Sequence, residues 1–256
     1  MIRAGRLADT LIGLVPIALI LLAWQAVHSA GLAPPALLPS PAAVFTRLAQ
    51  QLGSPAYLEH AAATLYRLFA GFGLALAVGV ALGVAATGSR AVGAVTGPIV
   101  RVLAPVPKIA LYPAFILTLG FDDASKIAAV FVDAVFPILI ATRQGTAAVE
   151  PKLAWSARAA GVSPARCLVT VVLPAALPSV LTGARIGLVI SCIVVFLAEM
   201  ITSTDGLGHL LVRAARNFQT VDMFVPLITI SLLGLTLNAA FNVLRARLLR
   251  GFPEES

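Results

Sequence analysis

Six segments of the chain are almost wholly apolar, and shorter stretches that hold most of the polar residues separate them. They cover about residues 11–28, 64–87, 93–119, 125–143, 181–201 and 222–244. A helix needs about 20 consecutive apolar residues to cross the hydrocarbon core of a bilayer, and these segments have about that length. The pattern therefore predicts an all-α membrane protein, with one transmembrane domain over 1–256 and six transmembrane helices.

The third of these segments is interrupted by prolines. Pro98, Pro105 and Pro107 lie within it, and Lys108 follows the last of them. Proline removes a backbone donor and kinks a helix, and backbone groups freed at membrane depth are tolerated where they meet protein or a wet cavity. Either the kink serves packing alone, or the helix lines a translocation path. On the second interpretation Arg101, Pro105 and Pro107 are path residues.

A more polar stretch, about 145–178, separates the fourth and fifth segments. It begins with good helix formers, and Gly161 suits the left-handed position just past a helix end. Ser163 is a natural N-cap, and Pro164 suits the first position of a second helix. Two Leu-Pro steps that begin at Leu173 then bend the chain into the fifth segment. We expect helix, turn, helix and elbow here; the alternative is an amphipathic linker lying on the membrane surface.

The composition agrees with a membrane protein and suggests its orientation. The chain is 59% hydrophobic and 11% charged, whereas a soluble domain has about 25% charged residues. The net charge of +7 does not indicate nucleic-acid binding, because the Lys and Arg residues are spread between apolar spans. With both termini in the cytoplasm, ten of them fall in inside segments and four in outside loops. We expect cytoplasmic termini in a bacterial inner membrane, and an uncleaved first span; a cleaved signal peptide is the alternative.

The chain lacks the motifs of the common enzyme classes. It contains no Gly-Lys pair, so it cannot form the phosphate-binding P-loop of an ATPase. His28, His60 and His209 have no metal-ligand spacing, and neither do Cys167 and Cys192, for which we expect no disulfide. We therefore predict that this chain is not an enzyme, and that it holds no metal and no cofactor.

Charges within or at the ends of the apolar segments are costly and indicate function by default, and we single out four of them. Asp133 lies midway in the fourth segment and Arg101 in the third. Glu199 lies at the outer end of the fifth segment and Arg185 at its inner end, where snorkelling or helix-end pairing could also account for them. Asp133 either pairs with Arg101 and is structural, or lines a path and favours a neutral or cationic solute. We take Arg101, Asp133 and Glu199 as candidate path residues.

The spacing in the polar stretch resembles a known motif. Gly161, nine residues, then Val171-x-Leu173-Pro174 is similar to the cytoplasmic coupling loop of ABC importer permeases, which reads Glu-Ala-Ala, three residues, Gly, nine residues, Ile-x-Leu-Pro. The Glu-Ala-Ala positions fall on Trp155, Ser156 and Ala157, so only the last residue matches. The missing carboxylate puts in doubt any contact that the family makes through it, but not the docking of a helix.

The resemblance extends over most of the chain. Five blocks look like the sulfonate, taurine and nitrate group of these permeases, in the same order and spacing: "LPSP" at 38–41, "PVPKIALYPAFILTLGFDDASKI" at 105–127, "LPAALPSVLTGARIGL" at 173–188, "AEMITSTDGLG" at 198–208 and "ARNFQTVDMF" at 215–224. The resemblance implies a type I importer permease fold, working as a pair of permease copies, most simply a homodimer. It also implies two ATP-binding subunits at the cytoplasmic face, each receiving one coupling loop, and an external substrate-binding protein.

Other classes of protein remain as alternatives. A stand-alone secondary transporter or channel would predict internal repeats, and no convincing inverted pair is present. A membrane scaffold without transport would explain neither the proline-broken segment nor the intramembrane charges. The sequence does not identify the solute, because sulfonates, taurine, nitrate and small heterocycles are all carried by similar permeases.

Overall fold

The computed structural model describes residues 2–34 and 36–252, with side chains described from residue 15 onward. Every regular element in this part of the chain is helical. In chain order the helices are α1 (Ile2–Ser29), α2 (Pro41–Leu52), α3 (Pro55–Gly88), α4 (Arg90–Leu103), the 3-10 helix η1 (Lys108–Leu111), α5 (Tyr112–Leu119), α6 (Asp123–Ala147), α7 (Pro151–Ala159), α8 (Pro164–Cys167), the π-helix η2 (Leu168–Val172), α9 (Leu173–Ala175), α10 (Leu177–Thr202), α11 (Leu207–Arg216) and α12 (Thr220–Leu248).

Four of the described helices are long and apolar enough to cross a membrane, namely α3, α6, α10 and α12. The pair formed by α4 and α5 makes a fifth span if the two helices are counted together. These helices overlap the second to sixth segments expected from the sequence. The first expected span, 11–28, lies in α1, but the side chains of its first residues are outside the described part of the chain.

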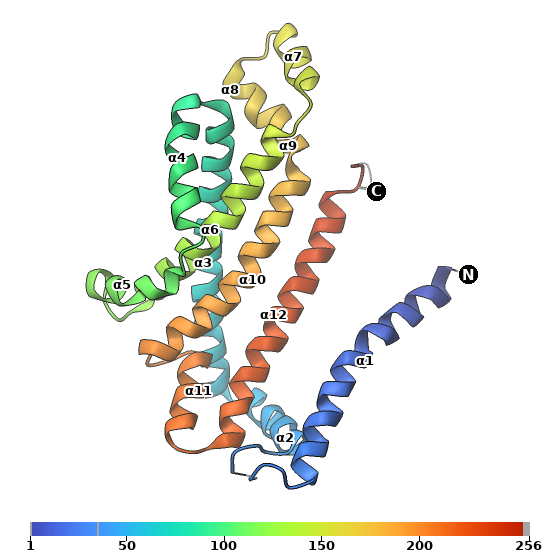
Figure 1. The fold of residues 1–256 in the computed structure, drawn as a ribbon, viewed down its shortest axis with the longest axis vertical. Helices are drawn as coiled ribbons and strands as arrows, with labels where there is room; N and C mark the ends of the chain where they lie inside the picture. The colour runs from blue at the N-terminus through green and yellow to red at the C-terminus, as the bar shows by residue number, and fades with distance from the viewer. Residues whose placement is uncertain (1, 35, 253–256) are drawn as a thin grey trace.

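The proline-rich segment turns through nearly a right angle. The helices on either side of it, Arg90–Leu103 and Lys108–Leu119, are bent by 91°. Pro105 and Pro107 lie in the non-helical link, where neither nitrogen can donate a helical hydrogen bond. The sequence predicted an interrupted span here, which is confirmed, but the interruption is a sharp turn rather than a kink. As a result α5 projects sideways from the bundle (Figure 1).

Helices α3, α6 and α10 form the tightly packed centre, and glycines allow their close approach. A β-carbon built at Gly71 or Gly83 of α3 would lie 2.6 Å from a side-chain atom of α6, whereas at Gly73 it would meet open space. A β-carbon at Gly183 of α10 would lie 2.6 Å from Ala141 of α6. Small residues allow such contacts between membrane helices, so three helices form one block. Gly73 lies on the same helix but does not contribute to this contact.

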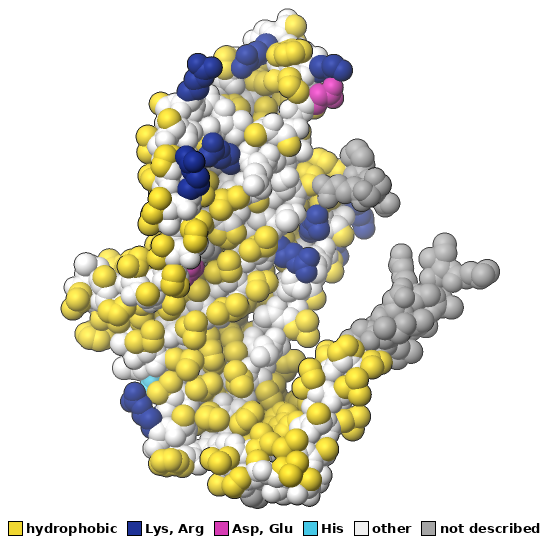
Figure 2. Space-filling view, viewed as in Figure 1, with side chains coloured by type: hydrophobic (Ala, Val, Ile, Leu, Met, Phe, Trp, Pro, Cys, Tyr) yellow, Lys and Arg dark blue, Asp and Glu magenta, His cyan; other side chains and the backbone are white. Residues whose placement is uncertain are grey.

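The remaining elements lie at the two ends and along the sides of the block (Figure 1). Helices α7, α8 and α9 gather at one end, which we call the loop end, and α2 and α11 lie at the other, which we call the α11 end. Helix α12 runs beside α10, while α1 leans away from the bundle toward its N-terminus. Hydrophobic side chains cover most of the visible face, with Lys and Arg side chains at the loop end and over α4 (Figure 2).

Candidate functional site

The loop end begins with α7, which closes at Gly161. The N–H of Gly161 donates to the carbonyl of Arg158 at 2.9 Å, and the N–H of Val162 donates to that of Ala157 at 3.0 Å. Gly161 has a φ of 83°, a left-handed conformation that glycine adopts without steric cost. This pair of bonds is the Schellman closure of a helix. The helix end predicted at Gly161 is therefore confirmed.

The second part of the loop is a continuous but irregular helix. The hydroxyl of Ser163 accepts a hydrogen bond from the N–H of Arg166 at 3.4 Å, and Pro164 begins α8, as predicted. Before Pro174 the helix widens, and the N–H of Leu173 donates to the carbonyl of Leu168, five residues back. Pro174 itself has no N–H to donate. The predicted elbow is thus a π-helical turn that leads into a proline, and the helical bonding does not stop there.

Close contacts seat this loop on the central block. A β-carbon at Gly88, the last residue of α3, would lie 2.3 Å from the side chain of Leu168, and one at Gly145 of α6 would lie 3.4 Å from that of Ala176. The end of the loop therefore packs against α3 and α6. On its outer side Trp155 is 64% exposed and Ser156 is exposed. An indole left in solvent on a short helix marks a surface that a partner can cover.

Asp133 in α6 pairs with a lysine and not with Arg101. Its carboxylate lies 3.5 Å from the ammonium of Lys108, and that ammonium lies 4.7 Å from the ring centre of Phe136. Pairing with Arg101, one of the two alternatives left open for Asp133, is not found, because the 91° turn brings η1 back against α6. Lys108 also donates to the carbonyls of Ala104 and Val106, at 3.2 and 3.1 Å. The same ammonium therefore balances Asp133 and satisfies carbonyls beside the prolines.

Glu199 is the centre of a buried ion-pair cluster. It is 1% exposed, and its Oε1 accepts a hydrogen bond from Nη1 of Arg67 at 2.8 Å. Its Oε2 accepts from the hydroxyl of Thr64 at 2.9 Å and from the N–H of Gly208 at 3.0 Å. Arg67 also pairs with Asp123 at 2.6 Å and with Asp205. The cluster joins α3, α6, α10 and the start of α11, and neither oxygen of Glu199 is left without a donor.

The sequence analysis did not single out Arg67. The available signal was its place near the start of the second apolar segment, where an arginine requires a carboxylate partner. Arg185, by contrast, donates to the side-chain oxygen of Asn238 at 2.8 Å and so joins α10 to α12. Helix-end pairing was one of the two explanations that the sequence left open for it.

The link between α10 and α11 is shaped around this cluster. Gly206 has a φ of 96°, and a β-carbon there would lie 2.3 Å from the carboxyl carbon of Glu199. The N–H of Gly206 donates to Nδ1 of His60 at 3.0 Å. Burial raises the pKa of Asp205, but the hydrogen bond and the charge of Arg67, together with the Ser203 hydroxyl, outweigh it and hold that pKa below its ordinary value. Asp205 is therefore ionised at neutral pH and strengthens the cluster.

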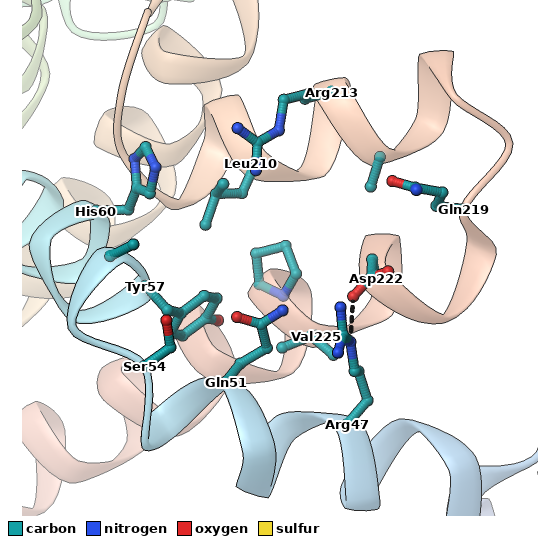
Figure 3. A pocket seen from close by; sticks show the side chains of 13 residues that line it. Arg47, Gln51, Ser54, Tyr57, His60, Leu210, Arg213, Gln219, Asp222 and Val225 are labelled. Carbon is teal, nitrogen blue, oxygen red and sulfur yellow. Dashed lines mark hydrogen bonds and ion pairs between the residues drawn. The ribbon is translucent and has the colours of Figure 1, made fainter.

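A polar pocket of about 250 Å³ lies at the α11 end, between α2, α3, α11 and α12 (Figure 3). Arg47 and Asp222 form an ion pair of 2.6 Å at one side of it. The hydroxyl of Tyr57 lies 2.6 Å from that of Thr229. These contacts connect α2 and α3 with α12, and none of the residues had been selected from the sequence. Among the described residues, no group of three His, Cys, Asp or Glu is placed to hold a metal ion.

Arg101 lies apart from both ion-pair systems. Its side chain lines a second pocket, between α4 and α6, together with Arg143. Pro105 and Pro107 are exposed in the link between α4 and η1. The structure therefore places the candidate path residues at four sites: the pocket between α4 and α6, the link between α4 and η1, the Lys108–Asp133 pair and the Glu199 cluster.

Known proteins resemble this chain in sequence and in fold. The family described as "Binding-protein-dependent transport system inner membrane component" matches residues 75–252. The putative aliphatic sulfonates transport permease protein SsuC of Bacillus subtilis (strain 168) is 31% identical over 238 residues, which are 93% of this chain and 86% of that protein. The taurine transport system permease protein TauC of Escherichia coli (strain K12) is 29% identical over 237 residues, which are 91% of this chain and 86% of TauC.

A solved structure shares the arrangement of helices. A chain of the MetNI methionine ABC transporter in an inward-facing conformation superimposes with a TM-score of 0.64, covering 75% of this chain and 95% of that chain at 20% sequence identity. At this identity the likeness concerns the fold alone. The family match covers well over half of the chain, and the relatives agree with it. This chain therefore belongs to the family of binding-protein-dependent transport system inner membrane components, as a multi-pass membrane permease component without ATPase activity of its own.

Proposed function

We propose that this chain is the transmembrane permease subunit of an ATP-binding-cassette importer and forms the translocation path for a small polar solute. The observation that carries the proposal is the loop end: a capped helix pair, closed at Gly161, is packed against the central block and presents an exposed Trp155. An exposed indole on a short helix outside the spans is suited to contact with a partner protein. The loop suits docking into a groove on an ATPase subunit.

The coupling residues act in sequence along the loop. Trp155, Ser156 and Ala157 on α7 form the contact with the ATPase, and the indole replaces the carboxylate of the family pattern with an apolar anchor. Gly161 fixes the angle between α7 and α8 through its left-handed conformation. Val171, Leu173 and Pro174 carry motion of the docked helix into α10 through the π-helical turn. Such a loop transmits closure of the ATPase pair as a movement of packed helices.

The proposed assembly has six transmembrane helices per copy and two permease copies, most simply a homodimer. Each copy binds one ATPase subunit at the loop end, which places that end and both termini in the cytoplasm. An external substrate-binding protein delivers the solute at the α11 end. Support for the orientation comes from the excess of Lys and Arg in the segments on the loop side. Helix α1, whose apolar side chains Val15, Ile17 and Leu19 are exposed, supplies the sixth span.

The path residues divide into two groups by their surroundings. Arg101 and the link with Pro105 and Pro107 lie at exposed positions and line the path directly. Asp133 and Glu199 are held by ion pairs, so they act by fixing the helices around the path. Lys108 neutralises Asp133, and this removes the reason for preferring a neutral or cationic solute. The solute class proposed is therefore that of the sequence relatives: a sulfonate, taurine, nitrate or a similar small anion or zwitterion.

Reconstitution tests this function. The chain is expressed with its ATPase subunit and binding protein, purified as a complex, and placed in vesicles loaded with ATP. We expect ATP-dependent uptake of a radiolabelled sulfonate and copurification of the ATPase. Uptake by the permease alone, without ATP, would instead indicate a stand-alone transporter.

A substitution at Gly161 tests the coupling. Valine is β-branched and cannot adopt a φ of 83° without strain, whereas asparagine tolerates the left-handed region. We expect Gly161→Val to assemble with the ATPase but to lose solute-stimulated ATP hydrolysis, and Gly161→Asn to retain it. Normal stimulation in the valine variant would disprove the coupling assignment.

A further inference from the structure

A pocket of about 530 Å³ lies between α4 and α6, toward the loop end. We call it the α4–α6 pocket. Its charged side chains are those of Arg101 and Arg143, and the side chain of Gln144 lies beside them. The rest of the lining is apolar or glycine: Gly93, Ala94, Gly97, Pro98, Val100, Leu139, Ile140 and Ala147. No carboxylate is among the lining residues.

The two arginines have no partner within the part of the chain whose side chains are described, 15–34 and 36–252. Neither guanidinium takes part in an ion pair or a side-chain hydrogen bond there. By contrast, Arg47 and Arg67 at the α11 end each pair with a carboxylate. Arg101 lies about 16 Å along the helix axis from the start of α4 at Arg90. Unpaired cations at such a depth are costly, and they face a wet cavity or a ligand that balances them.

Glycine in α4 creates the room for this charge. A β-carbon at Gly97 would lie 3.4 Å from Nη1 of Arg143, so the guanidinium of α6 reaches directly over the backbone of α4. At Gly93 a β-carbon would lie 2.8 Å from the carbonyl of Ala86, which fixes α4 against α3. The wall of the pocket opposite Arg143 is therefore held in place by packing, and the pocket does not depend on a mobile segment.

The donor set selects the chemistry of the ligand. Each guanidinium presents several N–H donors in a planar fork that matches the oxygens of a sulfonate or phosphate, and Gln144 adds an amide. Leu139, Ile140 and Pro98 offer apolar contact to a short alkyl chain. The volume is within the range of small-ligand pockets. Asp133 of α6 lies about 15 Å along the helix from Arg143, and its carboxylate is already balanced by Lys108.

We propose that the α4–α6 pocket is an anion subsite on the translocation path, where Arg101 and Arg143 bind the sulfonate group, or an equivalent tetrahedral oxyanion, of the solute before its release at the loop end. This inference rests on the proposed function and adds to it a binding site for the anionic group of the solute and a second arginine. The same chemistry would also bind the phosphate of a lipid headgroup, so the experiment separates the two sources.

The test measures anion binding to the permease–ATPase complex in nanodiscs of phosphatidylcholine, without nucleotide or binding protein. The probes are radiolabelled ethanesulfonate and sulfate, and equilibrium dialysis gives the affinity. Loss of charge-assisted hydrogen bonds predicts that R101Q/R143Q weakens binding by about tenfold or more. The matched control is R90Q, which removes an arginine from the same helix outside the pocket and leaves the affinity unchanged. R143K, which keeps the charge but not the fork, gives an intermediate affinity.

Three results would overturn the proposal. One is no binding of either probe to the wild-type complex, and another is equal binding by wild type and R101Q/R143Q. The third concerns nanodiscs that contain phosphatidylglycerol, studied by native mass spectrometry. There the wild-type complex would retain a lipid that R101Q/R143Q loses, and the wild-type complex would not bind ethanesulfonate. Failure of the proposed function would look different, because then the wild-type complex would show no ATP-dependent uptake at all.

Discussion

Replacing Arg67 by methionine tests the buried cluster at the α11 end. Arg67 pairs with Glu199, whose side chain is fully buried, and with Asp123 and Asp205, whose side chains are about half exposed. In Arg67→Met the two aspartates can turn to solvent, but the Glu199 carboxylate is left buried without its cation. Removing one partner of a buried ion pair typically costs about 3–5 kcal/mol, because the remaining charge is uncompensated. We expect a loss of that size in the free energy of unfolding.

The chain provides its own control for this experiment. The Arg47–Asp222 pair has the same short separation, 2.6 Å, but its side chains are 41% and 29% exposed. Solvent screens such a pair, so Arg47→Met should cost about 1 kcal/mol or less. A second control is Arg67→Met combined with Glu199→Leu. It removes the stranded carboxylate and should recover a large part of the stability, as replacement of a buried pair by apolar residues generally does.

The measurement is unfolding of the purified complex by a denaturing detergent, followed by circular dichroism, with binding of the ATPase subunit as a check on assembly. The reasoning is refuted if Arg67→Met costs less than about 1 kcal/mol, the value typical of an exposed pair. It is also refuted if Arg67→Met and Arg47→Met lose the same stability, since burial would then make no difference.

Three further predictions concern packing, the path and pH. Gly83→Ala places a β-carbon 2.6 Å from Thr142 and should cost about 1–3 kcal/mol in the same unfolding assay, whereas Gly73→Ala, which faces open space, should cost nothing. Asp133→Ala leaves the Lys108 ammonium unbalanced and should lower ATP-driven uptake by about tenfold while the ATPase still copurifies; loss of the whole complex would contradict this, because the ion pair would then be needed for assembly. The lowered pKa of Asp205 means that its carboxylate stabilises the fold above the ordinary pKa of 3.8, and that this contribution is lost as the pH falls through the lower value of the folded state. Asp205→Asn should therefore flatten the decline of the melting temperature below about pH 4, and an unchanged decline would contradict this.

Much of the architecture was predictable because it depends on local chemistry. The apolar runs predicted the positions of the second to sixth segments, because the requirement for about 20 apolar residues applies to each segment separately. Gly161, Ser163 and Pro164 located the turn between α7 and α8, since caps depend on neighbouring residues only. The prolines located the break in the third span for the same reason.

The ion pairs could not be predicted, because they join residues far apart in the chain. Arg67 and Glu199 are 132 positions apart, and their meeting depends on how α3 packs against α10. Pairing of Asp133 with Arg101 was one of two alternatives, because both charges lie within apolar segments. The 91° turn brings Lys108 to Asp133 instead and leaves Arg101 beside Arg143. One backbone angle thus changed the partners of three charges.

Helix α10 connects the two ends of the molecule in a single piece. It runs without a break from Leu177, just past the loop end, to Thr202, and carries Glu199 within its last turn. Its 26 residues make it about 39 Å long, so a tilt of about 5° at the loop end displaces the other end by about 3 Å. A small tilt of α10 at one end therefore becomes a larger displacement at the other end, where the buried carboxylate of Glu199 lies. A movement of that size exceeds the reach of a hydrogen bond, so under the proposed coupling a small displacement of the loop end is enough to form or break the Arg67–Glu199 contact.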